Sequence, residues 1–348
     1  MGRTAEAIGF FLLPMLLPGC STDVSERNVW NRTHDGPILR ICPPPGYYLE
    51  GAQWSNGVPF KSLFRPDSIP LWEQTRGVID CISGFDSPLR LCPGWEDPFE
   101  ENMMRGVFDS LEAWGIDFAV ETTCLHELYP TGRAAFDHFS EHWRILESWG
   151  ADIIQFTMDE PFRRMDELED PPGIEYAARE VAIYIHLVRS EFGGRVVLME
   201  PYPYFSGEEI REMILLLNGE LAELGESGLD GFTLDPDWRL FDRGVGSWIG
   251  VRGVEEFCRG EGIPFGLVYW ASEAGNCDPP IWDGGRDSMW RDEVMEQGME
   301  YRNAGGMPDE YVIMSWLWIP RAIADEYELC SFTRTVLDFC HAFVRGRM

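Results

Sequence analysis

Apolar and polar residues alternate along short segments of the chain, and each such segment precedes a longer one with helical spacing. In DIIQFTMDEP (152–161), Ile154, Phe156 and Met158 alternate with polar residues. Successive side chains of a strand point to opposite faces, so this pattern predicts a strand with one polar face. The following segment, 174–194, places apolar residues three and four positions apart and ends at two glycines, which predicts a helix.

This unit of strand and helix recurs along the chain. Strands are predicted at 37–42, 77–86, 116–125, 152–161, 195–204, 229–238, 263–273 and 311–320. Helices are predicted at 69–76, 101–115, 134–150, 174–194, 207–225, 252–262, 291–306 and 331–346. Eight such units in one chain of 348 residues predict a single α/β domain, a (β/α)8 TIM barrel over 37–348. A doubly wound open sheet is the alternative, but PPPGYY after the first strand is not the glycine-rich turn of such sheets.

The residues before the barrel have the pattern of an export signal. Residues 1–19 combine Arg3 with an apolar run that is too short to span a bilayer, so we expect a signal peptide. Leu17-Pro18-Gly19-Cys20 resembles a bacterial lipobox, in which the cysteine is lipidated after cleavage. We therefore expect a cell-envelope lipoprotein anchored through Cys20, with 20–36 as a polar tether; a secreted or periplasmic protein is the alternative.

Composition excludes several partners. The net charge is −31 and the chain has one lysine, whereas nucleic acids and anionic membrane surfaces bind basic patches. We therefore expect no nucleic-acid partner, and membrane contact only through Cys20; the pattern does not indicate an oligomeric state. Fourteen tryptophans fit either a rich core or platforms for sugar rings.

Cysteines other than Cys20 number eight, which in an exported protein permits disulfides. Cys81 and Cys92 are close enough in sequence to bridge a short loop, whereas buried free thiols are the alternative reading, favoured for Cys258 and Cys340 in their helical segments. Irregular spacing and the absence of a CxxC pair argue against zinc.

Acidic and aromatic residues gather at the carboxyl ends of the predicted strands, which is the face of a TIM barrel that carries chemistry. The strand ends hold Glu121, Asp159-Glu160, Glu200-Pro201-Tyr202, Asp235-Pro236-Asp237-Trp238, Trp270 with Glu273, and Ser315-Trp316. By alternation, Asp159, Asp235 and Asp237 point toward the barrel axis, and Glu160 is the first residue beyond the strand, where Pro161 ends it.

Three of these strand ends resemble those of clan A glycoside hydrolases. That group of (β/α)8 barrels carries an Asn-Glu-Pro-like acid/base motif after the fourth strand, a nucleophilic glutamate after the seventh and an aromatic residue after the eighth. Glu160-Pro161, Glu273 and Ser315-Trp316 occupy these places, although Asp159 stands where the group has asparagine. The resemblance implies that Glu160 is the acid/base, Glu273 the nucleophile and Trp316 a sugar platform.

Glycoside hydrolysis needs two carboxyl groups on one substrate, about 5 Å apart in retaining enzymes and about 6.5–9.5 Å apart in inverting ones. We expect a retaining enzyme. Glu200 is the main alternative to Glu273 as nucleophile, followed by Asp235 and Asp237. The other candidates for substrate contact are Asp159, Glu121, Tyr202, Asp237, Trp238, Trp270, and Arg40 at the first strand end.

Other functions fit the pattern less well. Four of six histidines lie in predicted helices, which argues against zinc; calcium or magnesium at Asp235 and Asp237 is an alternative to the expected absence of metal and cofactor. No GxSxG motif indicates a serine hydrolase, and a polysaccharide lyase needs more positive charge. A carbohydrate-binding surface lipoprotein without catalysis remains the main alternative to a hydrolase.

Overall fold

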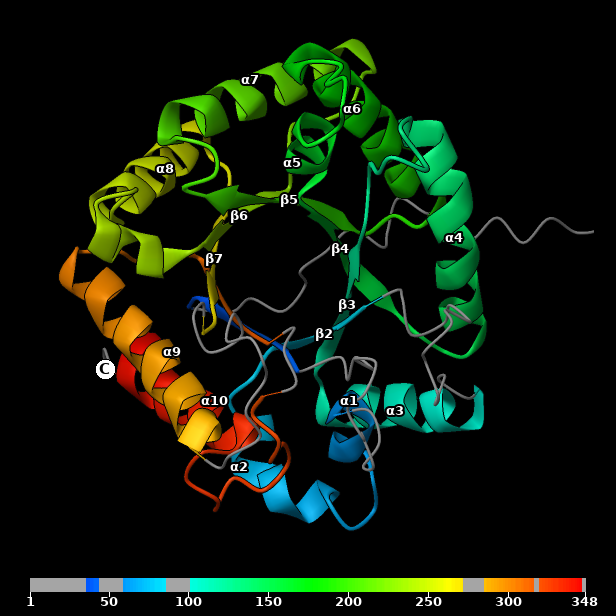
Figure 1. Cartoon of the computed structure of the whole chain (residues 1–348). Helices are drawn as coiled ribbons and strands as arrows, with labels where there is room; N and C mark the ends of the chain where they lie inside the picture. The colour runs from blue at the N-terminus through cyan, green and yellow to red at the C-terminus, as the bar shows by residue number, and fades with distance from the viewer. Residues whose placement is uncertain (1–35, 44–58, 86–100, 272–284, 316–318, 346–348) are drawn as a thin grey trace, which may run out of the picture.

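A computed structural model describes residues 36–43, 59–85, 101–271, 285–315 and 319–345. Eight parallel strands form a closed barrel in sequence order, and helices surround it (Figure 1). The strands are β1 (Ile38–Cys42), β2 (Cys81–Phe85), β3 (Asp117–Thr122), β4 (Ile153–Asp159), β5 (Arg195–Tyr202), β6 (Gly231–Pro236), β7 (Phe265–Tyr269) and β8 (Glu310–Met314). The barrel closes between β8 and β1, where Arg40 lies opposite Val312. The predicted TIM barrel is confirmed.

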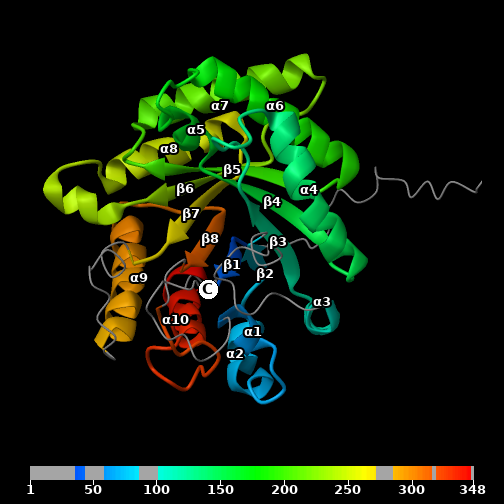
Figure 2. The ribbon, with the colours of Figure 1, turned by 45° about the vertical axis from the view of Figure 1, so that its right-hand side comes forward.

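Helices follow the strands and pack on the outside of the barrel (Figure 2). They are α1 (Pro59–Leu63), α2 (Glu73–Arg76), α3 (Glu101–Trp114), α4 (Gly132–Ser148), α5 (Pro161–Asp166), α6 (Ile174–Glu191), α7 (Gly207–Glu223), α8 (Trp248–Glu261), α9 (Gly285–Asn303) and α10 (Phe332–Phe339). Two 3-10 helices, η2 (Ile69–Trp72) and η4 (Trp238–Arg243), and a π-helical turn, η5 (Cys340–Val344), complete the elements. Within the described ranges, no helix combines the length and apolarity needed to span a bilayer.

The inside of the barrel has a polar layer around Arg40, the middle residue of β1. Arg40 is 1% exposed, and its Nε donates to Glu310 Oε1 at 2.5 Å. Its Nη1 donates to Ser83 at 2.9 Å and to Thr157 at 3.3 Å. A buried charge is tolerated when it is paired and hydrogen-bonded, as this guanidinium is. The polar layer therefore occupies the barrel interior around Arg40.

An apolar layer follows toward the carboxyl ends of the strands. It begins level with Arg40 at Val312, and Trp270 packs against it; its buried side chains are Cys42, Met199, Val268, Val312 and Met314. Burial of these side chains stabilises the barrel and separates the polar layer from the mouth. On β5 and β7, residues two positions beyond Met199 and Val268 on the same face therefore lie at the mouth, above an apolar floor.

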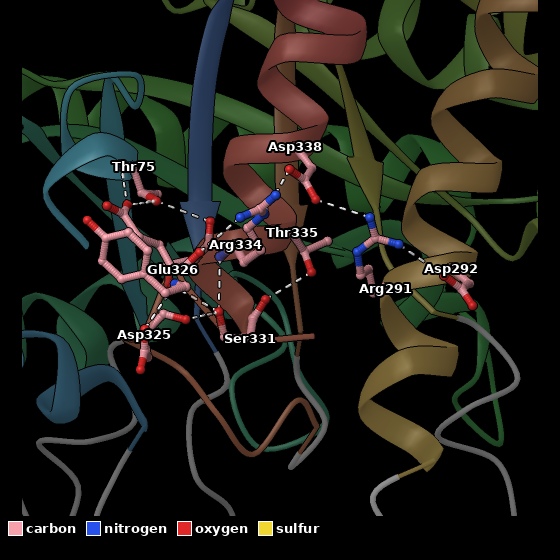
Figure 3. A network of polar contacts seen from close by, with 11 residues as sticks. Thr75, Arg291, Asp292, Asp325, Glu326, Ser331, Arg334, Thr335 and Asp338 are labelled. Atoms are coloured by element: carbon pink, nitrogen blue, oxygen red, sulfur yellow. Dashed lines mark hydrogen bonds and ion pairs between the residues drawn. The ribbon is translucent and has the colours of Figure 1, made fainter. Parts of the chain in front are cut away.

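The last loop of the chain is fastened to the first unit of the barrel. Glu326 accepts hydrogen bonds at 2.8 Å from both the backbone N–H and the hydroxyl of Thr75 in α2 (Figure 3). Arg291 of α9 pairs with Asp338 of α10 at 3.1 Å, and Arg334 donates to the same carboxylate at 2.9 Å. The Glu326 bonds thus tie α2, which is only one helical turn long, to the loop before α10, and the Arg291–Asp338 pair joins α9 to α10.

Cysteines within the described ranges are free thiols, and most are buried. Cys81 is among the buried ones, and its predicted partner Cys92 lies outside the described residues. The buried free thiols predicted for Cys258 and Cys340 are confirmed. Burial raises the pKa of the Cys258 thiol to about 12 and that of Cys340 to about 11, so neither is a reactive thiolate at neutral pH.

Candidate active site at the barrel mouth

Glu160 lies at the carboxyl end of β4 in a backbone conformation that glutamate rarely adopts. Its φ and ψ are 50° and 44°, in the left-handed region. Among the described residues it is the only non-glycine residue with positive φ. This conformation costs an L-residue about 1–2 kcal/mol and persists only where surrounding contacts impose it. Strained residues of this kind cluster at functional sites, which directs attention to Glu160.

Backbone contacts on both sides impose this turn. The N–H of Glu160 donates to the carbonyl of Met199 on β5 at 2.9 Å, and its own carbonyl accepts from the N–H of Arg164 at 3.0 Å. Pro161 begins α5, a position where the missing proline N–H costs nothing. The short helix α5 lies between β5 and the outer helices α6 and α7 (Figure 1).

Glu200 fixes the start of α5 from the neighbouring strand. Its carboxylate accepts from the N–H of Phe162 at 2.8 Å and from that of Arg163 at 3.3 Å. The side chain is fully buried on the helix side of β5, since Met199, the residue before it, faces the barrel interior. Both oxygens are occupied by backbone donors, which speaks against Glu200 as a nucleophile.

The side chain of Glu160 is close to an arginine and to another acid. Nη1 of Arg163 donates to both carboxylate oxygens, at 3.0 and 3.2 Å, and the Glu160 side chain is 14% exposed. Burial, followed by the charge of Asp159, raises the pKa of Glu160 to about 7, although Arg163 and Arg164 oppose the shift. The group is therefore about half protonated at neutral pH, as a general acid requires.

Asp159 is held by the next arginine of α5. Arg164 Nη2 donates to the Asp159 carboxylate, and Arg164 Nε donates to the Asp159 backbone carbonyl at 3.1 Å. Each acid of the Asp159-Glu160 pair thus has its own arginine. The sequence reasoning missed this helix and its arginines. A proline following Glu160, with arginines three positions after Glu160 and five after Asp159, was the signal that was available.

Asp235 and Asp237 lie at and beyond the end of β6. Asp235 is 7% exposed, and no described residue hydrogen-bonds its Oδ1. Burial, then the charges of Glu160, Asp159 and Asp237, raise the pKa of Asp235 well above its usual range. Asp237 is partly exposed, precedes η4, and its N–H donates to the carbonyl of Tyr202 at 2.7 Å. The structure therefore brings carboxyl groups of β4 and β6 together.

Trp270 is the partly exposed aromatic residue that follows β7. Its ring N–H donates to the carbonyl of Pro236 at 3.1 Å, and its own carbonyl accepts from the ring N–H of Trp238 at 3.2 Å. Its backbone N–H donates at 2.9 Å to Gln297, a fully buried residue of α9. These bonds hold the indole above the apolar layer, where a sugar ring could stack on it.

Two other predicted aromatic contacts are packed into the protein. Tyr202 is 6% exposed, and its hydroxyl accepts from the N–H of Ser247 at 3.2 Å. Trp238 is 3% exposed, and the Arg239 guanidinium lies 4.0 Å from its ring centroid. Little of either ring is accessible to a ligand, so both support the fold around the mouth.

Arg40 corrects the sequence analysis most clearly. It was predicted at the end of the first strand, with contact to substrate; it is the middle residue of β1 and is buried against Glu310 in the polar layer. That prediction is wrong, because the ion pair with Glu310 holds the side chain inside the barrel. Glu310 is 270 residues away in sequence, so the local pattern around Arg40 does not reveal the pair. Glu121 is 4% exposed near the end of β3.

Three predicted residues, Glu273, Trp316 and Cys20, lie outside the described residues. Within the described ranges, no group of three or more His, Cys, Asp or Glu side chains is placed to hold a metal ion.

No family model matches the sequence, and no curated protein matches it either. Solved structures with a similar fold include a thermostable xylanase mutant from Cellvibrio japonicus, with 11% identity, 85% of this chain and 91% of that chain covered, and a TM-score of 0.49. Fungal β-1,4-galactanases match with 8% identity, 78% and 90% coverage and a TM-score of 0.48. The carboxyl transferase domain of Rhizobium etli pyruvate carboxylase matches with 9% identity, 84% and 41% coverage and a TM-score of 0.47. These proteins catalyse different reactions, so function has to be argued from the site.

Proposed function

We propose that the chain is a glycoside hydrolase in which Glu160 is the general acid. The observation that carries the proposal is the state of this carboxyl group: it lies at the mouth of the barrel, on an imposed left-handed turn, with a pKa of about 7. A carboxylic acid that retains its proton near neutral pH can protonate the leaving oxygen of a glycosidic bond.

Arg163 suits this role because it stabilises the carboxylate that forms. When Glu160 gives up its proton, both oxygens accept hydrogen bonds from Nη1 of Arg163, and charge-assisted bonds of this kind are strong. The arginine thus lowers the cost of proton transfer, while burial and Asp159 keep the group protonated beforehand. The same acid would then serve as base for the incoming water if the enzyme is retaining.

The second carboxyl group of the reaction belongs, in this proposal, to Glu273 after β7. Strands β4 and β7 are three places apart in the closed ring of eight strands, so groups at their ends can face one substrate at the mouth. Trp270, three residues before Glu273, supports this placement because it leads the chain from β7 to the mouth. Asp235 is the alternative partner among the described residues.

Hydrolysis of 4-nitrophenyl and alkyl glycosides tests the proposal. Glu160→Gln should reduce kcat/KM on alkyl glycosides by about 10²–10⁴, the contribution of a positioned general acid. The loss should be much smaller on 2,4-dinitrophenyl glycosides, whose leaving group departs without protonation. Equal losses on both would remove Glu160 from the acid role, and no hydrolysis of any glycoside by the unmodified chain would leave the carbohydrate-binding protein as the better reading.

The sequence before the barrel supports a place in the cell envelope. We retain the proposal that the chain is exported and lipidated at Cys20, on the apolar run and the cysteine that follow Arg3. Expression in a bacterial host with radiolabelled palmitate should label the chain. Cys20→Ala should abolish the label, and labelling that survives the substitution would refute the assignment.

A further inference from the structure

Asp235 carries a buried oxygen without a described partner. The side chain is 93% removed from solvent, since it is 7% exposed, yet Oδ1 accepts no hydrogen bond from any described residue. Buried polar atoms in folded proteins are almost always hydrogen-bonded, because an unpaired one costs about 1–3 kcal/mol. An exception at the mouth of a TIM barrel indicates an atom that a ligand completes.

The strand register places this oxygen on the inner side of β6. Thr233 lies opposite Met199, which belongs to the apolar layer inside the barrel. Asp235 is two residues further along the same strand and therefore shares that face. It is also the penultimate residue of β6, so its side chain lies one layer above the apolar floor, at the mouth.

Within the described ranges, the charged groups that act on Asp235 are acids. Asp159 and Glu160 face it from β4, and Asp237 follows it on its own strand. Trp270, beyond β7, lies within hydrogen-bonding reach of the carboxyl group, and its ring N–H also donates to the carbonyl of Pro236. The nearby arginines of α5 already bond Glu160 and Asp159. A structural carboxylate at this depth would normally have a cationic or backbone partner, as Glu310 and Glu200 have.

We propose that Asp235 is a substrate-binding carboxyl group, whose Oδ1 hydrogen-bonds a hydroxyl group of a neutral saccharide between Glu160 and Trp270. This inference rests on the proposed function for the chemical class of the ligand. It adds a residue and a role, because the sequence resemblance assigns no contact to this position.

The ionisation state of the group fits a neutral ligand. Burial and the neighbouring acids raise the pKa of Asp235, which favours the protonated form, and a protonated carboxyl group can donate as well as accept a hydrogen bond. A sugar hydroxyl can take either role. A uronate would instead add a charge beside Asp159, Glu160 and Asp237, which like-charge repulsion opposes.

Thermal melting tests the state of the group without any ligand. A carboxyl group with a raised pKa in the folded state lowers stability progressively as the pH rises above the pKa of the unfolded chain. The melting temperature of Asp235→Asn should therefore exceed that of the unmodified chain by about 2–4 °C at pH 8.5. The difference between the two melting temperatures should be smaller at pH 5.5. Asp242→Asn, at an exposed carboxylate of the adjacent η4, is the control and should show no such gap. A lower melting temperature for Asp235→Asn at both pH values would show a paired structural acid and overturn the inference.

Ligand binding tests the role itself. Xylohexaose, cellohexaose, mannohexaose and galactotetraose are titrated calorimetrically into the full chain carrying Glu160→Gln, which prevents turnover. Asp235→Ala in that background should weaken the binding of the recognised saccharide at least tenfold. Asp235→Asn, which keeps a donor and an acceptor, should stay within about threefold, and Asp242→Asn should not change it.

The outcomes separate the two proposals. Undiminished binding by Asp235→Ala, or no binding of any of the four saccharides, overturns the role of Asp235. Binding that depends on Asp235 in a chain that hydrolyses no glycoside supports this inference and refutes the hydrolase. If the chain hydrolyses glycosides but Asp235→Ala binds the saccharide as tightly as before, the hydrolase is supported and the role of Asp235 is refuted.

Discussion

Nη1 of Arg163 donates to both carboxylate oxygens of Glu160, at 3.0 and 3.2 Å, from three residues further along the chain. The pair joins a strained turn to the first turn of α5 and sets the charge balance of the mouth. Because Arg163 favours the ionised acid and Asp159 disfavours it, the two residues tune the same pKa in opposite directions.

Substitution of these two residues should move the pH dependence of hydrolysis in opposite directions. In the unmodified chain, kcat/KM should fall above about pH 7 as Glu160 loses its proton. Arg163→Gln removes the opposing charge and should move this alkaline limb to higher pH, whereas Asp159→Asn should move it to lower pH. Arg65→Gln, an exposed arginine, is the control. Identical limbs in all four proteins would exclude Glu160 as the titrating acid.

The backbone strain at Glu160 should appear as a difference in stability between two variants that both shorten its side chain. Glu160→Gly and Glu160→Ala both remove the carboxyl group, but only glycine adopts positive φ without cost. Glu160→Gly should therefore be more stable than Glu160→Ala by about 1 kcal/mol in urea unfolding, and both should lack general-acid activity. Equal stability would mean that alanine relaxes the turn at no cost.

Glu200 should affect stability and rate together, without acting as a nucleophile. Glu200→Ala removes the acceptor of two backbone N–H groups at the start of α5 and should lower the free energy of unfolding by about 1.5–3 kcal/mol. Activity should fall because the turn bearing Glu160 loosens. Added azide should not restore it, whereas azide would replace a missing nucleophile; azide rescue with a glycosyl azide product would identify Glu200 as that nucleophile.

Removing one partner of the buried Arg40–Glu310 pair should lower the free energy of unfolding strongly, whereas replacing both with apolar residues should lower it little. Arg40→Met leaves Glu310 without its charged partner and should destabilise the protein by about 3–5 kcal/mol. The double substitution Arg40→Met with Glu310→Met should recover most of that loss, because it removes both buried charges. Chemical unfolding of the three proteins measures the difference, and additive losses would show that the two charges act independently.

The local spacing of apolar and polar residues was sufficient to predict the eight strands and most of the helices of the barrel. The predicted helix at 101–115 is observed as Glu101–Trp114, and the strand at 152–161 as Ile153–Asp159, because the periods of helices and strands are set by neighbouring residues. Helix α8 begins at Trp248, four residues before its prediction. Ser247 caps it by accepting from the N–H of Gly250, a signal that the apolar spacing alone does not contain.

Contacts between segments that are distant in sequence could not be predicted from local apolar and polar patterns. Helix α5 has six residues, too few for a periodic pattern, and its start is held by Glu200 on another strand. The burial of Arg40 depends on Glu310, and the open oxygen of Asp235 depends on which side chains fail to reach it. Alternation placed Asp159 and Asp235 at the mouth, but it could not distinguish a paired acid from an unpaired one.

The bond between Glu326 and Thr75 has a consequence for synthesis on the ribosome. The two residues are 251 positions apart, so α2 leaves the ribosome long before the carboxylate that holds it. Domains generally fold as units while the chain is made, N-terminal parts first. Here α2 does not gain its bonds to Glu326 until the loop between β8 and α10 has been translated. A chain interrupted before Glu326 therefore lacks both α10 and the contacts that hold α2.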